Sequence, residues 1–140
     1  MKNRFLHALL GASMAAVLVI SSGCATKSAP SQSVRLLEPV NNAVVGTNFK
    51  VRFGVVGMAV EPAGDVIANS GHNHLLINMD SIASGESIPF TPKHMHFGKG
   101  QQEADIKLEP GTYKITAQFA NGAHQSYGKE MSQTISITVK

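Results

Sequence analysis

Apolar and polar residues alternate with a period of two along much of the chain after residue 33, and this pattern constrains the fold more than any other feature. The alternation is clear in residues 49–55, 103–108, 113–119 and 134–139. Side chains two positions apart point to the same face of an extended strand, so each segment predicts a β-strand with one buried face. The sequence therefore favours antiparallel sheets that bury one face and expose the other.

Turn-forming residues separate these segments and indicate where strands connect. Asn, Gly, Ser and Pro cluster at residues 41–42, 62–64, 84–85, 110–111 and 121–122. Further strands are predicted at residues 34–37, 71–79 and 93–97. A total of about seven strands is typical of an immunoglobulin-like antiparallel β-sandwich, so we predict an all-β fold. Residues 34–140 suit one domain with its own core.

The first 23 residues have the pattern of a secretory signal peptide. Lys2 and Arg4 precede an almost wholly apolar run, residues 5–20, and small residues follow it. The run is shorter than the roughly 18 residues that a membrane-spanning helix needs, and a small-residue cleavage site comes directly after it. We therefore expect residues 1–23 to be removed and the remaining chain to be exported.

Cys24 is the only cysteine of the chain, and it directly follows Ser22 and Gly23. This arrangement resembles the bacterial lipoprotein signal, although that signal usually has Leu where this chain has Ser21. The resemblance implies a lipid on Cys24, and Ala25 implies a periplasmic protein tethered to the outer membrane. The alternative is ordinary cleavage near Ala25. Residues 24–33, rich in Ser, Ala, Lys and Pro, predict a flexible tether.

Charge gives no indication of nucleic-acid binding. The chain has 12 basic and 9 acidic residues, and two of the basic ones, Lys2 and Arg4, lie in the predicted signal peptide. The exported part therefore keeps 10 basic residues against 9 acidic ones. These basic residues are scattered singly and form no patch that could follow a phosphate backbone. We expect no nucleic-acid partner.

Histidines provide the clearest functional signal. Two His-x-His pairs lie within predicted strands, and a further histidine lies in a later Gly-containing loop; these residues are His72, His74, His94, His96 and His124. The two rings of each pair point to the same face of a strand. Asn73, Leu75 and Ile77 alternate with the first pair, so we expect the histidines to point away from the sandwich core.

Such a set predicts a transition-metal site. Imidazole nitrogens suit Cu(II), Zn(II) or Ni(II), whereas a thiolate-ligated blue-copper site needs a cysteine that the predicted domain lacks. We predict that the five histidines bind Cu or Zn for sequestration or delivery in the bacterial envelope. Because protons compete for the ring nitrogens, binding should weaken as the pH falls through about 6.5.

Several segments resemble the DUF4399 family of exported bacterial domains. They are residues 71–77, the His-Met-His-Phe-Gly-Lys-Gly-Gln string at 94–101, and residues 108–111, with further similarity at residues 39–45 and 57–64. The family often has His where this chain has Asn73 and Tyr113. No activity is established for the family, so the resemblance implies fold and location more than mechanism.

Two other classes of function remain open at this point. The domain could bind an envelope protein through its loops or an edge strand, with the histidines only structural. A histidine-bound copper could also support a superoxide-type oxidoreductase. Hydrolase chemistry is poorly supported, because the chain has no Gly-x-Ser-x-Gly motif around Ser70 or elsewhere. We predict no catalytic residue.

Overall fold

The computed structural model describes residues 31–140. The predicted signal peptide, Cys24 and all but the last residues of the predicted tether lie outside the described residues. The strands are β1 (Ser33–Glu38), β2 (Ala43–Val45), β3 (Asn48–Val56), β4 (Ala59–Val60), β5 (Ser70–Ile77), β6 (His94–His96), β7 (Glu103–Lys107), β8 (Gly111–Ala120) and β9 (Ser132–Val139). A 3-10 turn, η1 (Lys129–Met131), precedes β9. No helix within the described residues is long and apolar enough to cross a membrane.

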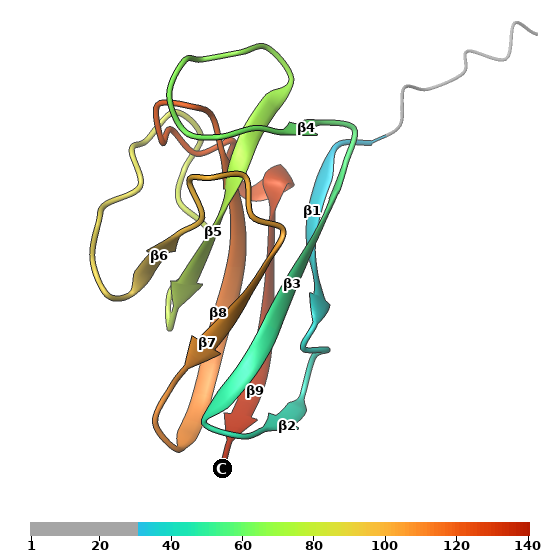
Figure 1. The fold of residues 1–140 in the computed structure, drawn as a ribbon, viewed down its shortest axis with the longest axis vertical. Coiled ribbons are helices and arrows are strands. Elements are labelled where there is room, and N and C mark those ends of the chain that lie inside the picture. Colours follow the sequence, from blue (N-terminus) through green and yellow to red (C-terminus); the bar gives the residue numbers. More distant parts are fainter. Residues whose placement is uncertain (1–30) are drawn as a thin grey trace, which may run out of the picture.

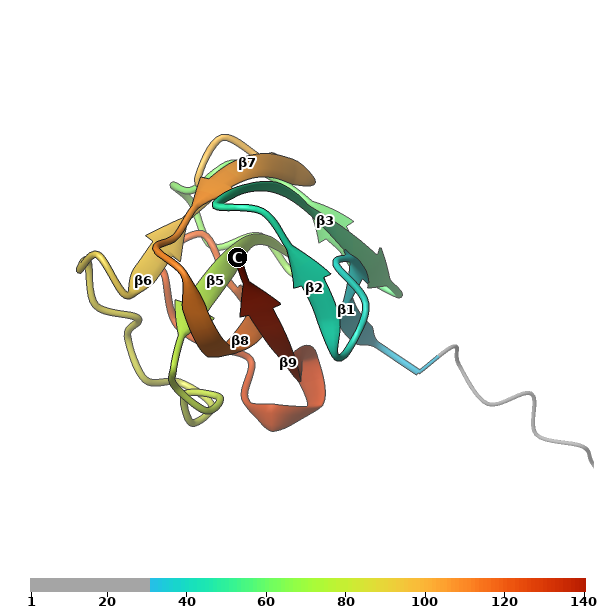
Figure 2. The same ribbon diagram turned by 90° about the horizontal axis from the view of Figure 1, so that it is seen from below.

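Two sheets face each other across an apolar core. One sheet has the order β1-β3-β7, and the other has the order β2-β9-β8-β5-β4, with β6 added beside β5. Figure 1 shows the long strands running along the length of the molecule, and the end-on view of Figure 2 shows the two layers. This arrangement confirms the predicted all-β sandwich.

Two short strands at the sheet margins, β2 and β4, were not expected from the alternation. β2 pairs in parallel with β9, and β4 pairs in parallel with β5. They contain three and two residues respectively, which is too short for a period of two to be visible. The predicted strands are otherwise found, and they pair antiparallel with their neighbours.

The main core lies between the two sheets. Its fully buried members come from central strands of both layers and include Val51, Leu75, Ile115, Ala117 and Phe119. On β5, Leu75 and Ile77 belong to this core, so the neighbouring residues His74 and Leu76 must point to the opposite side of the sheet. The alternation therefore predicts correctly which side of β5 carries the histidines.

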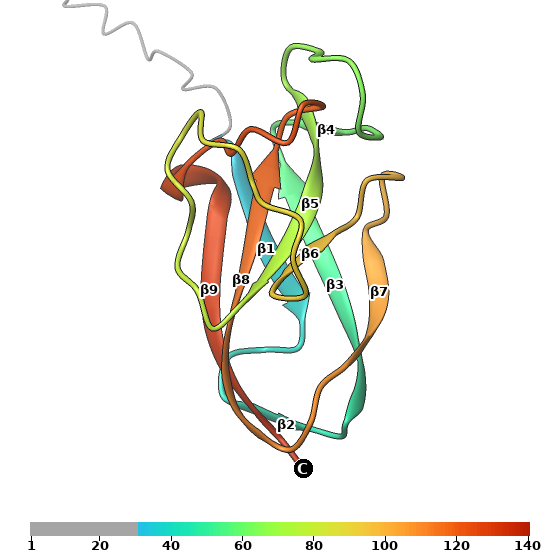
Figure 3. The same cartoon turned by 90° about the vertical axis from the view of Figure 1, so that its left-hand side faces the viewer.

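The outer side of β5 is nevertheless buried as well. All eight residues of β5 are buried, because the long connection between β5 and β6, residues 78–93, runs along the outside of the sheet (Figure 3). Ile88 of this connection packs with Leu76 and Ala120 in a second, small apolar cluster. The connection thus covers the outer side of β5, and Leu76 has an apolar environment there.

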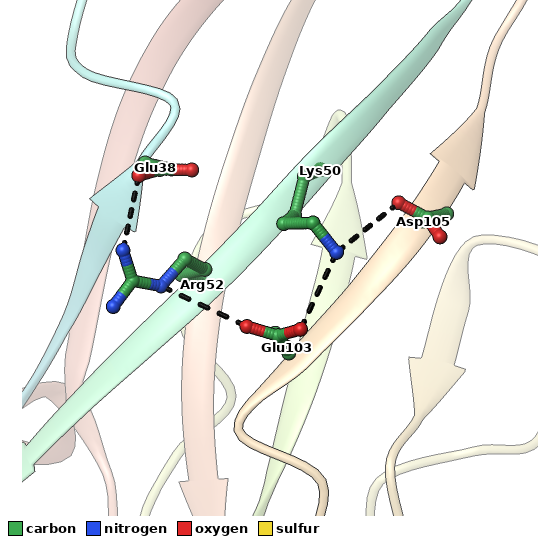
Figure 4. A network of polar contacts seen from close by, with 5 residues as sticks. All are labelled: Glu38, Lys50, Arg52, Glu103 and Asp105. Carbon is green, nitrogen blue, oxygen red and sulfur yellow. Dashed lines mark hydrogen bonds and ion pairs between the residues drawn. The ribbon is translucent and has the colours of Figure 1, made fainter.

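The outer face of the other sheet, by contrast, is exposed and charged. Lys50 and Arg52 of β3 form ion pairs with Glu38 of β1 and with Glu103 and Asp105 of β7 (Figure 4), at N···O distances between 3.1 and 3.9 Å. These side chains are largely exposed, so solvent screens the pairs and they contribute little to stability. The two outer faces of the sandwich therefore differ in character.

Candidate metal centre

The register between β5 and β6 places His74 directly opposite His96. Backbone hydrogen bonds on either side, from Phe97 N to Asn73 O and from Ile77 N to Lys93 O, make this a non-hydrogen-bonded pair of an antiparallel ladder. Side chains of such pairs approach most closely. The two ring centroids are 5.0 Å apart, so the two histidine-bearing strands lie side by side, as a metal site shared by both pairs requires.

His72, near the start of β5, and His124, in the turn that follows β8, complete the group. His72 lies opposite Ala120, the last residue of β8, and the chain then turns through residues 121–125. The Asn121 side-chain oxygen accepts hydrogen bonds from Ala123 N and Gln125 N. Within this turn His124 has a φ of 63°, a left-handed conformation uncommon for non-glycine residues. The turn thereby returns the His124 ring to the β5 face.

Four imidazoles converge in this way. His72 Nε2 lies 2.9 Å from His74 Nε2, 3.1 Å from His96 Nε2 and 3.0 Å from His124 Nδ1. All four ligand atoms lie within 4.8 Å of one another. Four nitrogens bound tetrahedrally at about 2 Å from one ion would be about 3.3 Å apart. The group therefore matches the dimensions of a mononuclear site.

Burial keeps the rings neutral. His72 and His74 are 0% and 1% exposed. Burial, followed by the neighbouring histidines, lowers the pKa of His72 to about 4 and that of His74 to about 2. Burial and then His124 also lower the pKa of His96. Neutral imidazoles carry the lone pairs that a metal ion needs, so His72 and His74 are in the ligating form at neutral pH.

The second nitrogen, Nδ1, of each of the two buried rings does not take part in this group. Within residues 31–140, neither His72 Nδ1 nor His74 Nδ1 has a hydrogen-bond partner. A buried polar atom without a partner costs about 1–3 kcal/mol, so the protein holds these rings in place at a cost in stability. Within the described residues, contacts with one another and with the rings of His96 and His124, and not hydrogen bonds at Nδ1, hold the two rings.

His94, the fifth histidine of the predicted site, lies outside the group of four. It is opposite Leu76 in the β5–β6 register, one step along the same face from His96. Its Nδ1 is 2.7 Å from Thr91 Oγ1. The described residues thus bring together His72, His74, His96 and His124 and give His94 a different partner.

The glycine-rich string after β6 supports the position of His96. A side chain at Gly98 would overlap the His96 ring, so only glycine leaves room for it. Gly100 has a φ of 76°, which glycine adopts easily. The carbonyl of Gln101 then accepts a hydrogen bond from Asn73 Nδ2. The Phe-Gly-Lys-Gly-Gln sequence is thereby explained as the support that joins β6 to β5.

Phe90 is a component of the site that sequence reasoning missed. Its ring lies edge-on to His96 and His124, at centroid distances of 5.2 and 4.9 Å, yet 67% of the residue is exposed. The only available signal was one large aromatic residue in a connection of mixed polar and apolar sequence. Such a residue could equally have belonged to the core, so its place above the histidines was not predictable.

Comparison with protein families identifies a related domain. The family model of a domain of unknown function, DUF4399, matches residues 51–140. The match includes every histidine of the site and the glycine-rich string, whereas residues 39–45, which also resemble the family, lie before it. No curated protein and no solved structure matches the chain. Because the family model covers more than half of the sequence, the chain belongs to the DUF4399 family.

Proposed function

We propose that this domain binds one transition-metal ion, Cu(II) or Zn(II), through His72, His74, His96 and His124, and that it sequesters or delivers the ion in the bacterial envelope. The proposal follows from the arrangement of the ring nitrogens. Both ions accept imidazole nitrogen as a ligand, and the four residues supply a complete set of such donors.

The observation that carries the proposal is the crowding around His72 Nε2. In a neutral imidazole, each ring nitrogen has either one proton or one in-plane lone pair, so it makes one strong hydrogen bond. Three other ring nitrogens lie within 3.1 Å of His72 Nε2. Hydrogen bonding accounts for one of these three contacts, whereas coordination of a shared ion accounts for all of them.

This crowding also favours binding over the two alternatives. Histidines with a purely structural role would be expected to pair their buried nitrogens one to one, whereas three other ring nitrogens crowd around His72 Nε2. A copper-dependent oxidoreductase needs a coordination position for its substrate. The four histidines already supply all the ligands of a four-coordinate ion, so such a position would require a fifth coordination site or the loss of one histidine.

Metal titration by calorimetry, with the ion content checked by mass spectrometry, tests the proposal. The parent domain should take up one equivalent of Cu(II) or Zn(II) at neutral pH, and His72→Ala should take up far less. His94→Ala is the matched control, because it removes a histidine of β6 that lies outside the group of four. Absence of uptake by the parent, or equal uptake by His72→Ala and the parent, would contradict a metal site centred on His72.

The envelope location rests on the N-terminal sequence. We propose that residues 1–23 are removed and that Cys24 carries a lipid that tethers the domain to the outer membrane. Mass spectrometry of protein purified from its native host should then find acyl mass on an N-terminal Cys24. A mature N-terminus at Ala25 or later, without lipid, would refute the tether and would leave the metal site unaffected.

A further inference from the structure

We propose that Phe90 and His124 form a gate over the metal centre, and that His124 is the ligand that an incoming metal-binding group replaces. This inference rests on the proposed function, because it concerns how an ion enters and leaves the same four histidines. It assigns the histidines unequal roles. His72, His74 and His96 stay fixed on β5 and β6, and His124 moves together with the segment that carries Phe90.

Exposure divides the four histidines into two classes. His72 and His74 are buried within β5, whereas His96 and His124 are only partly buried. Phe90 contacts the rings of these two partly buried histidines. Solvent therefore reaches the group on the side that Phe90 covers, since β5 and the sandwich core close the opposite side.

The segment that carries Phe90 and the turn that carries His124 are connected by backbone contacts. Ile88 N donates a hydrogen bond to His124 O over 2.9 Å, and Ser87 bridges Gln125 in an antiparallel manner. The segment that carries Phe90 and the turn that carries His124 are therefore joined along their backbones. Ile88 is also packed against Leu76 and Ala120, so opening of this segment must break that buried contact, and Phe90 and His124 then move together.

The three remaining ligands do not depend on that movement. His72 and His74 belong to β5, which is paired with β8 along residues 72–77. His96 is held by the β5–β6 register and by the room that Gly98 leaves for its ring. Opening of the gate breaks the bond between the metal ion and His124 Nδ1. A nitrogen or sulfur donor from the acceptor then forms a bond in its place while three protein ligands retain the ion.

Extraction of Zn(II) from the loaded domain by a coloured chelator, followed by stopped-flow absorbance, tests the gate. Phe90→Ala should accelerate extraction by about tenfold or more, as removal of a cover does when opening limits the rate. The equilibrium affinity should change little, because Phe90 supplies no ligand atom. The matched control is Val44→Ala in β2, which removes a comparably exposed apolar residue at the far edge of the sheet.

A second measurement does not need the metal. In the metal-free domain, Phe90→Ala should accelerate modification of His124 and His96 by diethylpyrocarbonate, mapped by peptide mass spectrometry, and His72 and His74 should stay protected. Equal extraction and modification rates in Phe90→Ala and the parent would overturn the gate while leaving the metal site standing. Absence of Zn(II) uptake by the parent would overturn the proposed function and, with it, the gate.

Discussion

The buried neutral histidines predict that the metal-free domain loses stability steeply in mild acid. In the unfolded chain every histidine binds a proton as the pH falls through about 6.5. In the folded domain, burial lowers the pKa of His72 to about 4 and that of His74 to about 2. Between pH 6.5 and these lowered pKa values the unfolded state binds more protons than the folded state, so the free energy of unfolding must fall as the pH falls.

The size of the effect follows from the number of protons. Each histidine that is protonated only in the unfolded chain contributes a slope of about 1.4 kcal/mol per pH unit. For His72 and His74 together, the free energy of unfolding should decrease by about 4 kcal/mol between pH 7.5 and pH 5. The total free energy of unfolding of a protein domain is typically about 5–15 kcal/mol. His96, whose pKa is also lowered, adds a contribution of the same sign.

Urea denaturation in the presence of EDTA, followed by circular dichroism at several pH values, measures this loss. The variant His72→Leu/His74→Leu should lose most of the pH dependence over the same range, because it removes both buried titratable rings. His94→Leu is the control and should keep it. A free energy of unfolding that stays flat between pH 7.5 and pH 5 in the metal-free parent would refute the reasoning.

Further predictions concern the core, the glycine support, the charged face and metal release. Leu75→Ala should lower the free energy of unfolding by about 2–5 kcal/mol in denaturant titrations, because the Leu75 side chain is fully buried. Gly98→Ala should weaken metal uptake in calorimetry by displacing the His96 ring, whereas Gly46→Ala, where the nearest atom to an added Cβ is 3.8 Å away, should not. Glu103→Gln should leave the denaturation midpoint almost unchanged, since its ion pairs are exposed. Dialysis at stepwise lower pH should release the metal below the pH of about 6.5 that the sequence alone predicts, because burial lowers the pKa of His72 and His74.

The long strands and the side of β5 that carries the histidines were predictable, because a period of two specifies both. Leu75 and Ile77 face the core, as their alternation with the histidines requires. The burial of that outer face was not predictable. It depends on residues 78–93 folding back over the sheet, and the large apolar residues of that segment have no regular spacing that would indicate it; they are Met79, Ile82, Ile88 and Phe90.

The membership of the site was predictable only in part, for the same physical reason. A His-x-His pair guarantees a shared face, but it does not guarantee a shared ligand position. His96 lies opposite His74, whereas His94 lies opposite Leu76 and contacts Thr91 instead. His124 joins the group through its turn, whose geometry depends on Asn121. The register between paired strands decides which histidines meet, and the local sequence pattern does not determine that register.

The wide separation of the ligands along the chain has a consequence for the order of events during biogenesis. His72 and His124 are 52 residues apart, and they meet only after β5 has paired with β8 and the following turn has closed. Such non-local contacts are slow to form. An unfolded chain presents its histidines only as two separate pairs and the single His124, so we expect loading to follow folding. The metal content of a purified population would then report the fraction of molecules that have completed their fold.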